Sequence, residues 1–295
     1  MQDRKLYLGP LTDNRRWDQI QIRPDDVIVV TPPKSGTTWM QTIIALLLSG
    51  DPDVEPDLSE QMPWVDIRFR PIEDLAARLG AMTGRRCLKS HTPLDGLPIK
   101  DQAHYLCVFR HPLDVHFSFR HHNRNLSMTF FDHWFPEDDT TGIAFGHFLA
   151  GGPEGFDADA APLAHILRHY QTAKALSGRP NVSLFHYADM KRDLPGTFAR
   201  IADLLGVSHP ALVMERLVQS ATFDHMKTHA DRYVPFSNTA SFGVQSDFFH
   251  AGTNGQWQGR LTDEETAAYD AMMDAQLSPK DRAWLETGSE SDPDV

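Results

Sequence analysis

Two lysines, one arginine and one histidine are the residues of this chain whose types and positions could do chemistry. Lys34 lies in a loop, Lys89 and His91 close one short apolar run, and Arg110 closes another. Fixed cations are suited to charge that develops on transferring and leaving oxygens. A neutral imidazole is suited to taking a proton from an attacking hydroxyl near neutral pH. Together these residue types predict a site for an anion and a second, nucleophilic partner.

The loop that carries Lys34 spans residues 31–39, Thr-Pro-Pro-Lys-Ser-Gly-Thr-Thr-Trp. It follows the apolar residues 27–30 and leads into the mostly apolar residues 40–48, an order typical of strand, tight loop and helix. The free N–H groups at a helix N-terminus favour an anion. A Walker A loop places its lysine directly after the last glycine, whereas Lys34 comes two residues before Gly36. The sequence therefore predicts a phosphate- or sulfate-binding loop that is not the ordinary ATPase version.

Short apolar runs alternate with segments of helical pattern along the chain. Strands are predicted at 27–30, 87–91, 105–110 and 181–187, and helices at 112–123, around 163–170, and at 195–205, 210–219 and 263–276. This alternation predicts one α/β domain with a P-loop-like parallel sheet and helices on both faces. Ligands bind at the carboxyl ends of the strands in such folds. The lysines, His91 and Arg110 are therefore expected at one edge of the sheet.

The domain prediction has three parts. Residues 1–24 are expected to form an arm on the surface, 25–287 the domain, and 288–295 a disordered acidic tail. Within the domain, the aromatic and glycine-rich residues 125–160 show no clear hydrophobic period. This pattern predicts a mobile loop that covers a pocket.

The composition is that of a globular protein with an acidic surface. The net charge of −12 argues against a nucleic-acid partner, which would need a basic face. Cys87 and Cys107 each lie in an apolar run and are predicted as core residues without a disulfide. No run approaches membrane-spanning length and the N-terminus has no apolar targeting segment, so no membrane partner and a cytoplasmic location are expected.

Several short motifs follow one another along residues 25–262. They are Pro33-Lys34-Ser35-Gly36-Thr37-Thr38-Trp39, Lys89-Ser90-His91-Thr92-Pro93, Arg110 with Ser118, Tyr187-Ala188-Asp189-Met190-Lys191, Phe223 with Met226-Lys227, and Gly252-Thr253-Asn254-Gly255-Gln256-Trp257. One such loop alone is moderately specific evidence for a protein family, whereas the whole set of motifs in this order is strong evidence. In these motifs the chain resembles the cytosolic-type sulfotransferases.

The resemblance implies a donor, 3′-phosphoadenosine 5′-phosphosulfate (PAPS), whose sulfuryl group moves in line to a hydroxyl or amine of a small acceptor. It implies that the loop holds the 5′-phosphosulfate through Lys34, Ser35, Gly36, Thr37 and Thr38. In the same comparison Lys34 also stabilises the leaving bridging oxygen, Lys89 meets charge on the sulfuryl oxygens, and His91 is the general base.

The resemblance also assigns the other end of the donor. Arg110 and Ser118 would bind the 3′-phosphate, and Trp39 and Phe223 would sandwich the adenine with Tyr187 close by. Two departures from the family pattern stand out. His250-Ala251-Gly252 replaces an Arg-Lys-Gly sequence, so two cations near the 3′-phosphate are lost, although a protonated His250 could substitute in part. Of the family's dimer segment only Thr262 survives, so the oligomeric state is left open.

Two other functions stay open from the residues alone. A P-loop kinase for a small molecule would need ATP and Mg²⁺, yet no Walker B-type acid follows an apolar strand. A non-catalytic nucleotide-binding protein is suggested by the cations missing at 250 and 251. No HExxH or paired Cys/His spacing predicts a metal.

Simpler interpretations stand beside several of these assignments. Trp39 and Phe223, each taken alone, could be ordinary core residues, and Ser118 could face solvent. Arg110 and Asp114 could form only a surface ion pair. An aromatic group could either pack within a lid or line a pocket for an apolar or aromatic acceptor; it comprises Trp64, Phe69, Phe130, Phe131, Trp134 and Phe135.

Overall fold

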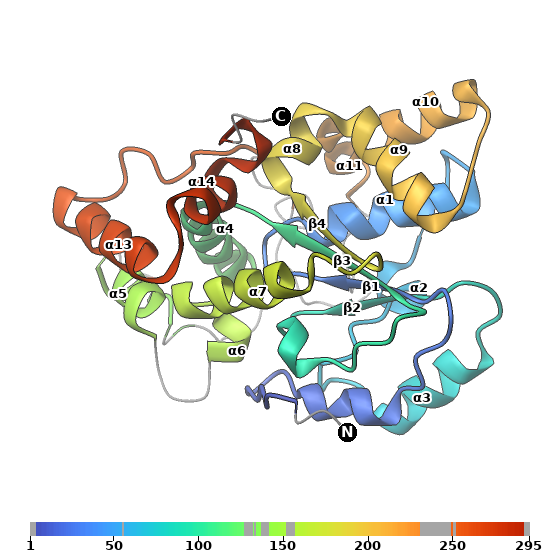
Figure 1. Cartoon of the computed structure of the whole chain (residues 1–295), viewed down its shortest axis with the longest axis horizontal. Helices are drawn as coiled ribbons and strands as arrows, with labels where there is room; N and C mark the ends of the chain where they lie inside the picture. The colour runs from blue at the N-terminus through green and yellow to red at the C-terminus, as the bar shows by residue number, and fades with distance from the viewer. Residues whose placement is uncertain are drawn as a thin grey trace.

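The computed structural model describes residues 4–54, 56–126, 132, 134–136, 142–151, 157–230, 249 and 252–291. Its centre is a parallel sheet in the order β2-β1-β3-β4 (Figure 1). The strands are β1 (Val27–Val30), β2 (Cys87–Ser90), β3 (His104–Phe109) and β4 (Val182–His186). All four predicted strands and the parallel α/β fold are therefore confirmed.

The sheet is buried on both faces because alternate residues of each strand supply two separate cores. Ile28 and Val30 of β1 pack in one core, and Val27 and Val29 pack in the other. The first core lies under α4 (Pro112–Asn125) and α7 (Leu163–Leu176), and the second under α1 (Thr37–Ser49), α9 (Leu194–Leu205) and α10 (Ala211–Ser220). Figure 1 shows these two groups of helices on opposite sides of the sheet. This layering explains why the strands are apolar throughout.

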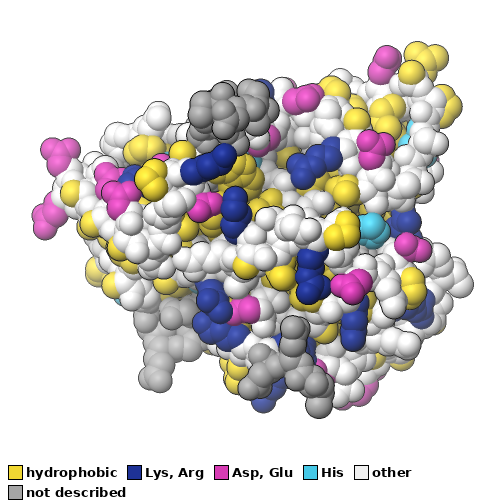
Figure 2. Space-filling view, in the orientation of Figure 1, with side chains coloured by type: hydrophobic (Ala, Val, Ile, Leu, Met, Phe, Trp, Pro, Cys, Tyr) yellow, Lys and Arg dark blue, Asp and Glu magenta, His cyan; other side chains and the backbone are white. Residues whose placement is uncertain are grey.

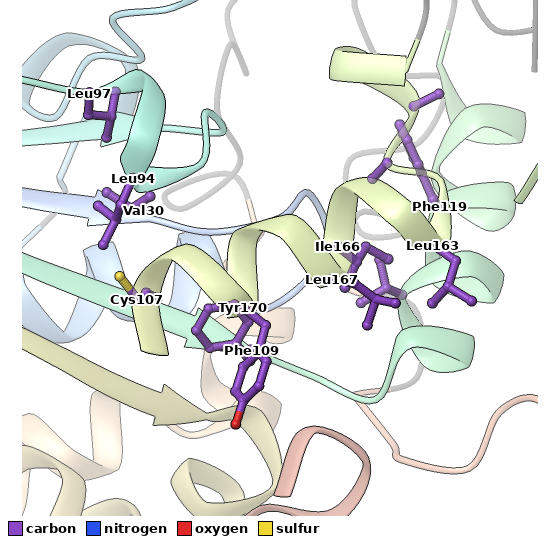
Figure 3. Packing of buried hydrophobic residues seen from close by; sticks show 14 of the residues in the cluster. Val30, Leu94, Leu97, Cys107, Phe109, Phe119, Leu163, Ile166, Leu167 and Tyr170 are labelled. Atoms are coloured by element: carbon purple, nitrogen blue, oxygen red, sulfur yellow. The ribbon is translucent and has the colours of Figure 1, made fainter. Parts of the chain in front are cut away.

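Helix α7 shows how the sequence period becomes packing. Leu163, Ile166, Leu167 and Tyr170 recur at helical spacing, and all four are buried. Figure 3 shows them on one side of α7, in the cluster that includes Val30, Cys107 and Phe109 of the strands. The predicted apolar face of this helix is thus confirmed.

The other predicted helices also form, and several additional short ones appear. Helices α9, α10 and α13 (Asp263–Gln276) match their predicted ranges to within one residue, and α4 extends two residues further. The remaining elements are η1 (Asn14–Gln19), α2 (Leu58–Gln61), α3 (Ile72–Ala81), η2 (Leu94–Gly96), α5 (Gly142–Ala150), α6 (Asp157–Ala160), α8 (Tyr187–Arg192), α11 (Phe223–Thr228), α14 (Pro279–Thr287) and η4 (Gly288–Ser291).

The prediction of a loop over residues 125–160 is wrong in part. Helices α5 and α6 lie within this range, and Trp134 and Phe135 are buried in the core beside Phe145 and Phe148 of α5. Helix α5 is apolar over most of its length, so it has little polar face to reveal a helical period. Phe130 and Phe131 lie outside the described residues.

The two ends of the chain are more integrated than predicted. Trp17 in η1 is 2% exposed, and its indole nitrogen donates a hydrogen bond to the Asp66 carboxylate at 2.5 Å. Residues 4–24 therefore contribute to the core rather than lying only on the surface. At the other end, the Ser289 backbone N–H and hydroxyl donate to Asp189. The predicted disordered tail is thus folded as far as Ser291, and residues 292–295 lie outside the described part.

Both cysteines are free and buried, on opposite faces of the sheet, as expected for core residues. Burial raises the pKa of the Cys107 thiol to about 12. No helix in the described ranges is long and apolar enough to cross a membrane. On the described part of the face shown in Figure 2, lysines and arginines are interspersed with acidic and apolar side chains and form no broad basic patch.

Candidate active site

The four strands end next to one another, and each is followed at once by a residue of the predicted site or of its loop. Thr31 follows β1, His91 follows β2, Arg110 follows β3 and Tyr187 follows β4. Because the strands are parallel and in register, these four positions share the carboxyl edge of the sheet. The convergence predicted from the sequence is therefore confirmed.

The loop after β1 is shaped to leave backbone N–H groups open to an anion. Lys34 and Gly36 both adopt positive φ angles, 66° and 106°. The N-cap residue of α1 is Gly36, which has no side chain to cap the free N–H groups of the first turn. A Cβ atom on Gly36 would lie 3.0 Å from the Tyr187 ring, so both the backbone angle and the available space require glycine.

The hydroxyls of this loop divide into two groups. Thr31 and Thr37 bond each other at 2.5 Å, which ties the end of β1 to the first turn of α1. The Ser35 hydroxyl is fully buried and has no hydrogen-bond partner among the described residues. Buried hydroxyls almost always have a partner. An anion bound in the loop would supply one, so these residues fit the predicted 5′-phosphosulfate.

Lys34, Lys89 and Arg110 lie close enough together for their charges to interact. Burial, with Arg110 and Lys89 close by, lowers the pKa of Lys34 to about 7. Burial also lowers the pKa of Lys89 to about 8, and its ammonium lies 4.5 Å from the centre of the Trp64 ring. Cations gathered in this way favour an anionic ligand.

His91 is held in one tautomer by its hydrogen bond to the backbone. Its Nδ1 lies 2.7 Å from the Thr31 carbonyl oxygen, which can only accept, so Nδ1 carries the proton and Nε2 has a free lone pair. Burial and the charge of Lys89 keep the pKa of His91 well below its ordinary value. The imidazole is therefore neutral at physiological pH, as a general base must be before it acts.

Asp66 is a functional candidate that sequence reasoning missed. Its fully buried carboxylate accepts hydrogen bonds from the His91 backbone N–H at 2.7 Å, the Ser90 hydroxyl, and the indoles of Trp17 and Trp64. Burial raises its pKa, and the four donors act against that rise. The chain gives one signal, an isolated acid two residues after Trp64. Its other three partners are 24 to 49 residues away in sequence, so only the fold connects Asp66 with His91.

Three further residues surround His91. The Trp64 ring meets the His91 ring edge-on at 4.7 Å, which makes Trp64 the member of the predicted aromatic group that lies beside His91. Nε2 of His169 donates to the His91 carbonyl oxygen at 2.9 Å, and the His165 ring packs against His169. These contacts help to hold the turn after β2 in place.

Arg110 and Asp114 are not a surface ion pair. Both are buried, and Arg110 donates to the Thr253 carbonyl at 2.7 Å while its guanidinium lies 4.5 Å from the centre of the Tyr187 ring. Asp114 accepts from the backbone N–H groups of Gly255 and Gln256. The pair thus ties the loop at 252–257 to the sheet edge. The Arg110 Nε is buried without a partner among the described residues, so it is available to a ligand there.

The residues predicted around the adenine lie near the same edge. Trp39 is half-buried, meets the Tyr187 ring edge-on at 5.2 Å, and donates its indole N–H to the Ala221 carbonyl. Phe223, half-buried at the start of α11, packs so closely on Gly252 that a Cβ there would lie 2.4 Å from its ring.

The remaining predicted site residues are placed as follows. Thr38 and Ser118 are half-buried, in α1 and α4 respectively. His250 and Ala251 lie outside the described residues. Among the residues that the structure describes, no three His, Cys, Asp or Glu side chains are grouped to hold a metal, and the absence of a metal stays a prediction.

Comparison with known proteins gives one family over most of the chain. The model of the sulfotransferase domain matches residues 24–281. The glycolipid sulfotransferase of Mycobacterium tuberculosis (strain ATCC 25177 / H37Ra) is 34% identical, covering 98% of this chain and 96% of that protein. Human sulfotransferase 1C2 is 25% identical, covering 90% of this chain and 88% of that protein.

A solved structure supports the same fold. Retinol dehydratase in complex with androsterone and the inactive cofactor PAP superposes with a TM-score of 0.72 at 21% identity, covering 94% of this chain and 90% of the other. The family match decides against the kinase and the non-catalytic alternatives that the residues alone had left open. The chain belongs to the sulfotransferase family and is a PAPS-dependent sulfotransferase.

Proposed function

We propose that this sulfotransferase transfers the sulfuryl group to a hydroxyl of a glycolipid-like acceptor, with His91 as the general base. The observation that carries the role of His91 is its Nδ1–H bond to the Thr31 carbonyl. That bond leaves the Nε2 lone pair for the acceptor proton, in an imidazole that stays neutral. Bound PAPS supplies the sulfuryl group and a phosphate leaving group.

The lysines have distinct roles in this proposal. Lys34 holds the 5′-phosphosulfate together with Ser35 and the backbone N–H groups at the start of α1, and it neutralises charge on the leaving oxygen. Lys89 meets charge on the sulfuryl oxygens. The lowered pKa values of both lysines rise again when an anion binds beside them, so the bound state holds both as ammonium groups.

Arg110 and Ser118 bind the 3′-phosphate, and Trp39 and Phe223 stack on the adenine. The buried Arg110 Nε without a partner among the described residues supports this assignment. Gly252, at a φ of 59°, lets its loop approach Phe223 closely, and this packing supports a role for the loop beside the adenine. His250 and Ala251 stay in the proposed site from the sequence alone.

The acceptor class rests on two observations. Relatives that are 34% identical over nearly the whole chain carry the name glycolipid sulfotransferase. Trp64, half-buried beside His91, is an aromatic side chain of the kind that lines pockets for apolar ligands. A screen with labelled PAPS over glycolipids, phenols, aliphatic alcohols and amines tests the class, and preferential labelling of phenols or amines would contradict it.

Replacing His91 tests the base. His91→Ala should lower kcat by roughly 10²–10⁴-fold, because proton removal in the transition state is lost. PAP affinity, measured by calorimetry, should change little. A matched control is His104→Gln at the opposite end of the sheet, where β3 begins. A His91→Ala enzyme that turns over as fast as the control would overturn the assignment.

A further inference from the structure

One surface of the molecule combines exposed apolar side chains with basic ones in an otherwise acidic protein. It consists of residues 4–16 and 67–70, and we call it the N-terminal rim. Leu6, Leu8 and Phe69 of the rim are 54%, 41% and 51% exposed. They are three of the five large hydrophobic residues with such exposure among those the structure describes.

The two segments of the rim are joined by backbone pairing. Thr12 bridges Ile67, and the Arg68 N–H donates to the Leu11 carbonyl at 2.9 Å. Arg16 completes the connection by donating to the carbonyls of Val65 and Arg70. The two segments that carry these apolar and basic side chains therefore lie side by side, near the N-terminus and α3 (Figure 1).

The rim is strongly basic for this chain. It holds six basic residues, which are Arg4, Lys5, Arg15, Arg16, Arg68 and Arg70, and one acidic residue, Asp13, whereas the whole chain has a net charge of −12. Within the described residues, Arg4, Arg15 and Arg70 pair with Asp18, Asp13 and Glu60. Lys5, Arg16 and Arg68 have no carboxylate at ion-pair distance in that part of the chain, so a positive charge remains.

The segments that form or adjoin the rim also contain buried residues that lie near His91. Tyr7, between Leu6 and Leu8, packs on His165, which packs on His169 behind the His91 turn. Trp64, five residues before Phe69, contacts His91 directly. A ligand that covers the rim would thus lie on the side of the molecule from which Trp64 and His169 contact the His91 turn.

We propose that the N-terminal rim docks the enzyme on an anionic lipid bilayer, from which it takes its lipid acceptor. This inference rests on the proposed glycolipid-like acceptor. Apolar side chains bordered by cations are the combination that binds a bilayer surface without crossing it. The sequence had led us to expect no membrane partner. The rim changes that expectation to peripheral binding, for which no spanning helix is needed.

Co-sedimentation with vesicles that contain no glycolipid tests the docking by itself. Wild-type protein should bind phosphatidylcholine vesicles that contain phosphatidylglycerol, bind pure phosphatidylcholine much less, and be released by salt. Lys5→Glu with Arg68→Glu should lower the partition coefficient by about tenfold or more, since each basic residue contributes about fivefold. Leu8→Asp with Phe69→Asp should have a similar effect.

Leu212→Asp is the matched control, because Leu212 is 75% exposed but lies on α10, far from the rim in Figure 1. It should leave vesicle binding within about twofold of wild type. Stabilisation by PAP in a thermal shift checks that every variant is folded. Wild-type protein that ignores anionic vesicles, or rim variants that bind as well as the control, would overturn the docking.

The acceptor is tested separately with glycolipid dispersed in detergent. Sulfation of dispersed glycolipid without vesicle binding would refute the docking surface and keep the acceptor. Vesicle binding that needs the rim, without sulfation of any glycolipid, would keep the surface and refute the acceptor.

Discussion

The proposed PAPS site has two ends: a transfer end at Lys34, Lys89 and His91, and a far end at Arg110 and the loop at 252–257. The two ends are held in place in different ways. At the transfer end, Lys89 lies within β2 and His91 follows it directly, and the buried Asp66 carboxylate fixes the His91 backbone. The backbone hydrogen bonds of the sheet and the buried Asp66 carboxylate therefore hold these groups in place. Few local movements could displace them without disturbing the sheet.

At the far end, side chains from the sheet edge reach out to a loop. Arg110 donates to Thr253, and Asp114 accepts from Gly255 and Gln256. A few side-chain bonds hold this loop, so its position can adapt to a ligand. The difference suggests that the transfer end governs turnover and that the far end governs donor affinity.

Replacing Lys34 should give the largest effect among the substitutions that probe this comparison. Lys34→Met should lower kcat/KM for PAPS by about 10²–10³-fold, because a preorganised charge at the leaving oxygen is lost. Lys100→Met, on the exposed surface before β3, is the control. Steady-state kinetics at varied PAPS would decide, and an unchanged kcat/KM would remove Lys34 from the site.

Asp66 should act as a positioning residue of the transfer end. Asp66→Asn places amide donors against groups that already donate, so kcat should fall by about 10- to 100-fold through misplacement of His91. The free energy of unfolding should fall by about 1–3 kcal/mol. PAP affinity should stay close to wild type.

Asp159→Asn separates the structural from the catalytic effect of such a change. Asp159 is also a buried carboxylate that accepts from the backbone, at Leu11, but it belongs to α6 and does not contact His91. Its variant should lose stability and keep kcat. If Asp66→Asn, like Asp159→Asn, loses stability but keeps the wild-type kcat, Asp66 has no positioning role.

The far end should respond in affinity rather than in turnover. Arg110→Lys keeps the charge but loses the planar set of donors, so PAP should bind about tenfold more weakly. The kcat at saturating PAPS should stay within about threefold of wild type. Calorimetry with PAP and a full kinetic titration measure the two effects, and a fall in kcat larger than the loss of affinity would reverse the comparison.

The pH dependence of PAP binding should give the smallest effect. Before PAP binds, Lys34 and Lys89, with pKa values lowered to about 7 and about 8, lose protons as pH rises through this range. The anion binds the protonated lysines more tightly, so binding takes up protons and affinity should fall by about two- to fivefold between about pH 7 and 7.7. Calorimetry in two buffers of different ionisation enthalpy measures the uptake, and affinity that rises with pH would contradict it.

Much of the fold followed from local pattern. The four strands and helices α7, α9, α10 and α13 have clear periods or runs, so the prediction located them to within a few residues. Helix α5 was missed because it lacks a polar face. The burial of the N-terminal segment was missed because the hydrogen-bond partner of Trp17, Asp66, is far away in the sequence.

The sequence by itself determined the chemistry of the site. The residue types and order of the loop at 31–39, Lys89, His91 and Arg110 specify an anion-binding edge, because parallel strands must end together. Only the tertiary structure decided which nitrogen of His91 is free and which carboxylate holds its turn. It also decided that Asp114 anchors a loop and that Leu6, Leu8 and Phe69 are exposed on segments that pair with each other. These features depend on contacts between residues far apart in the chain, about which local sequence carries no information.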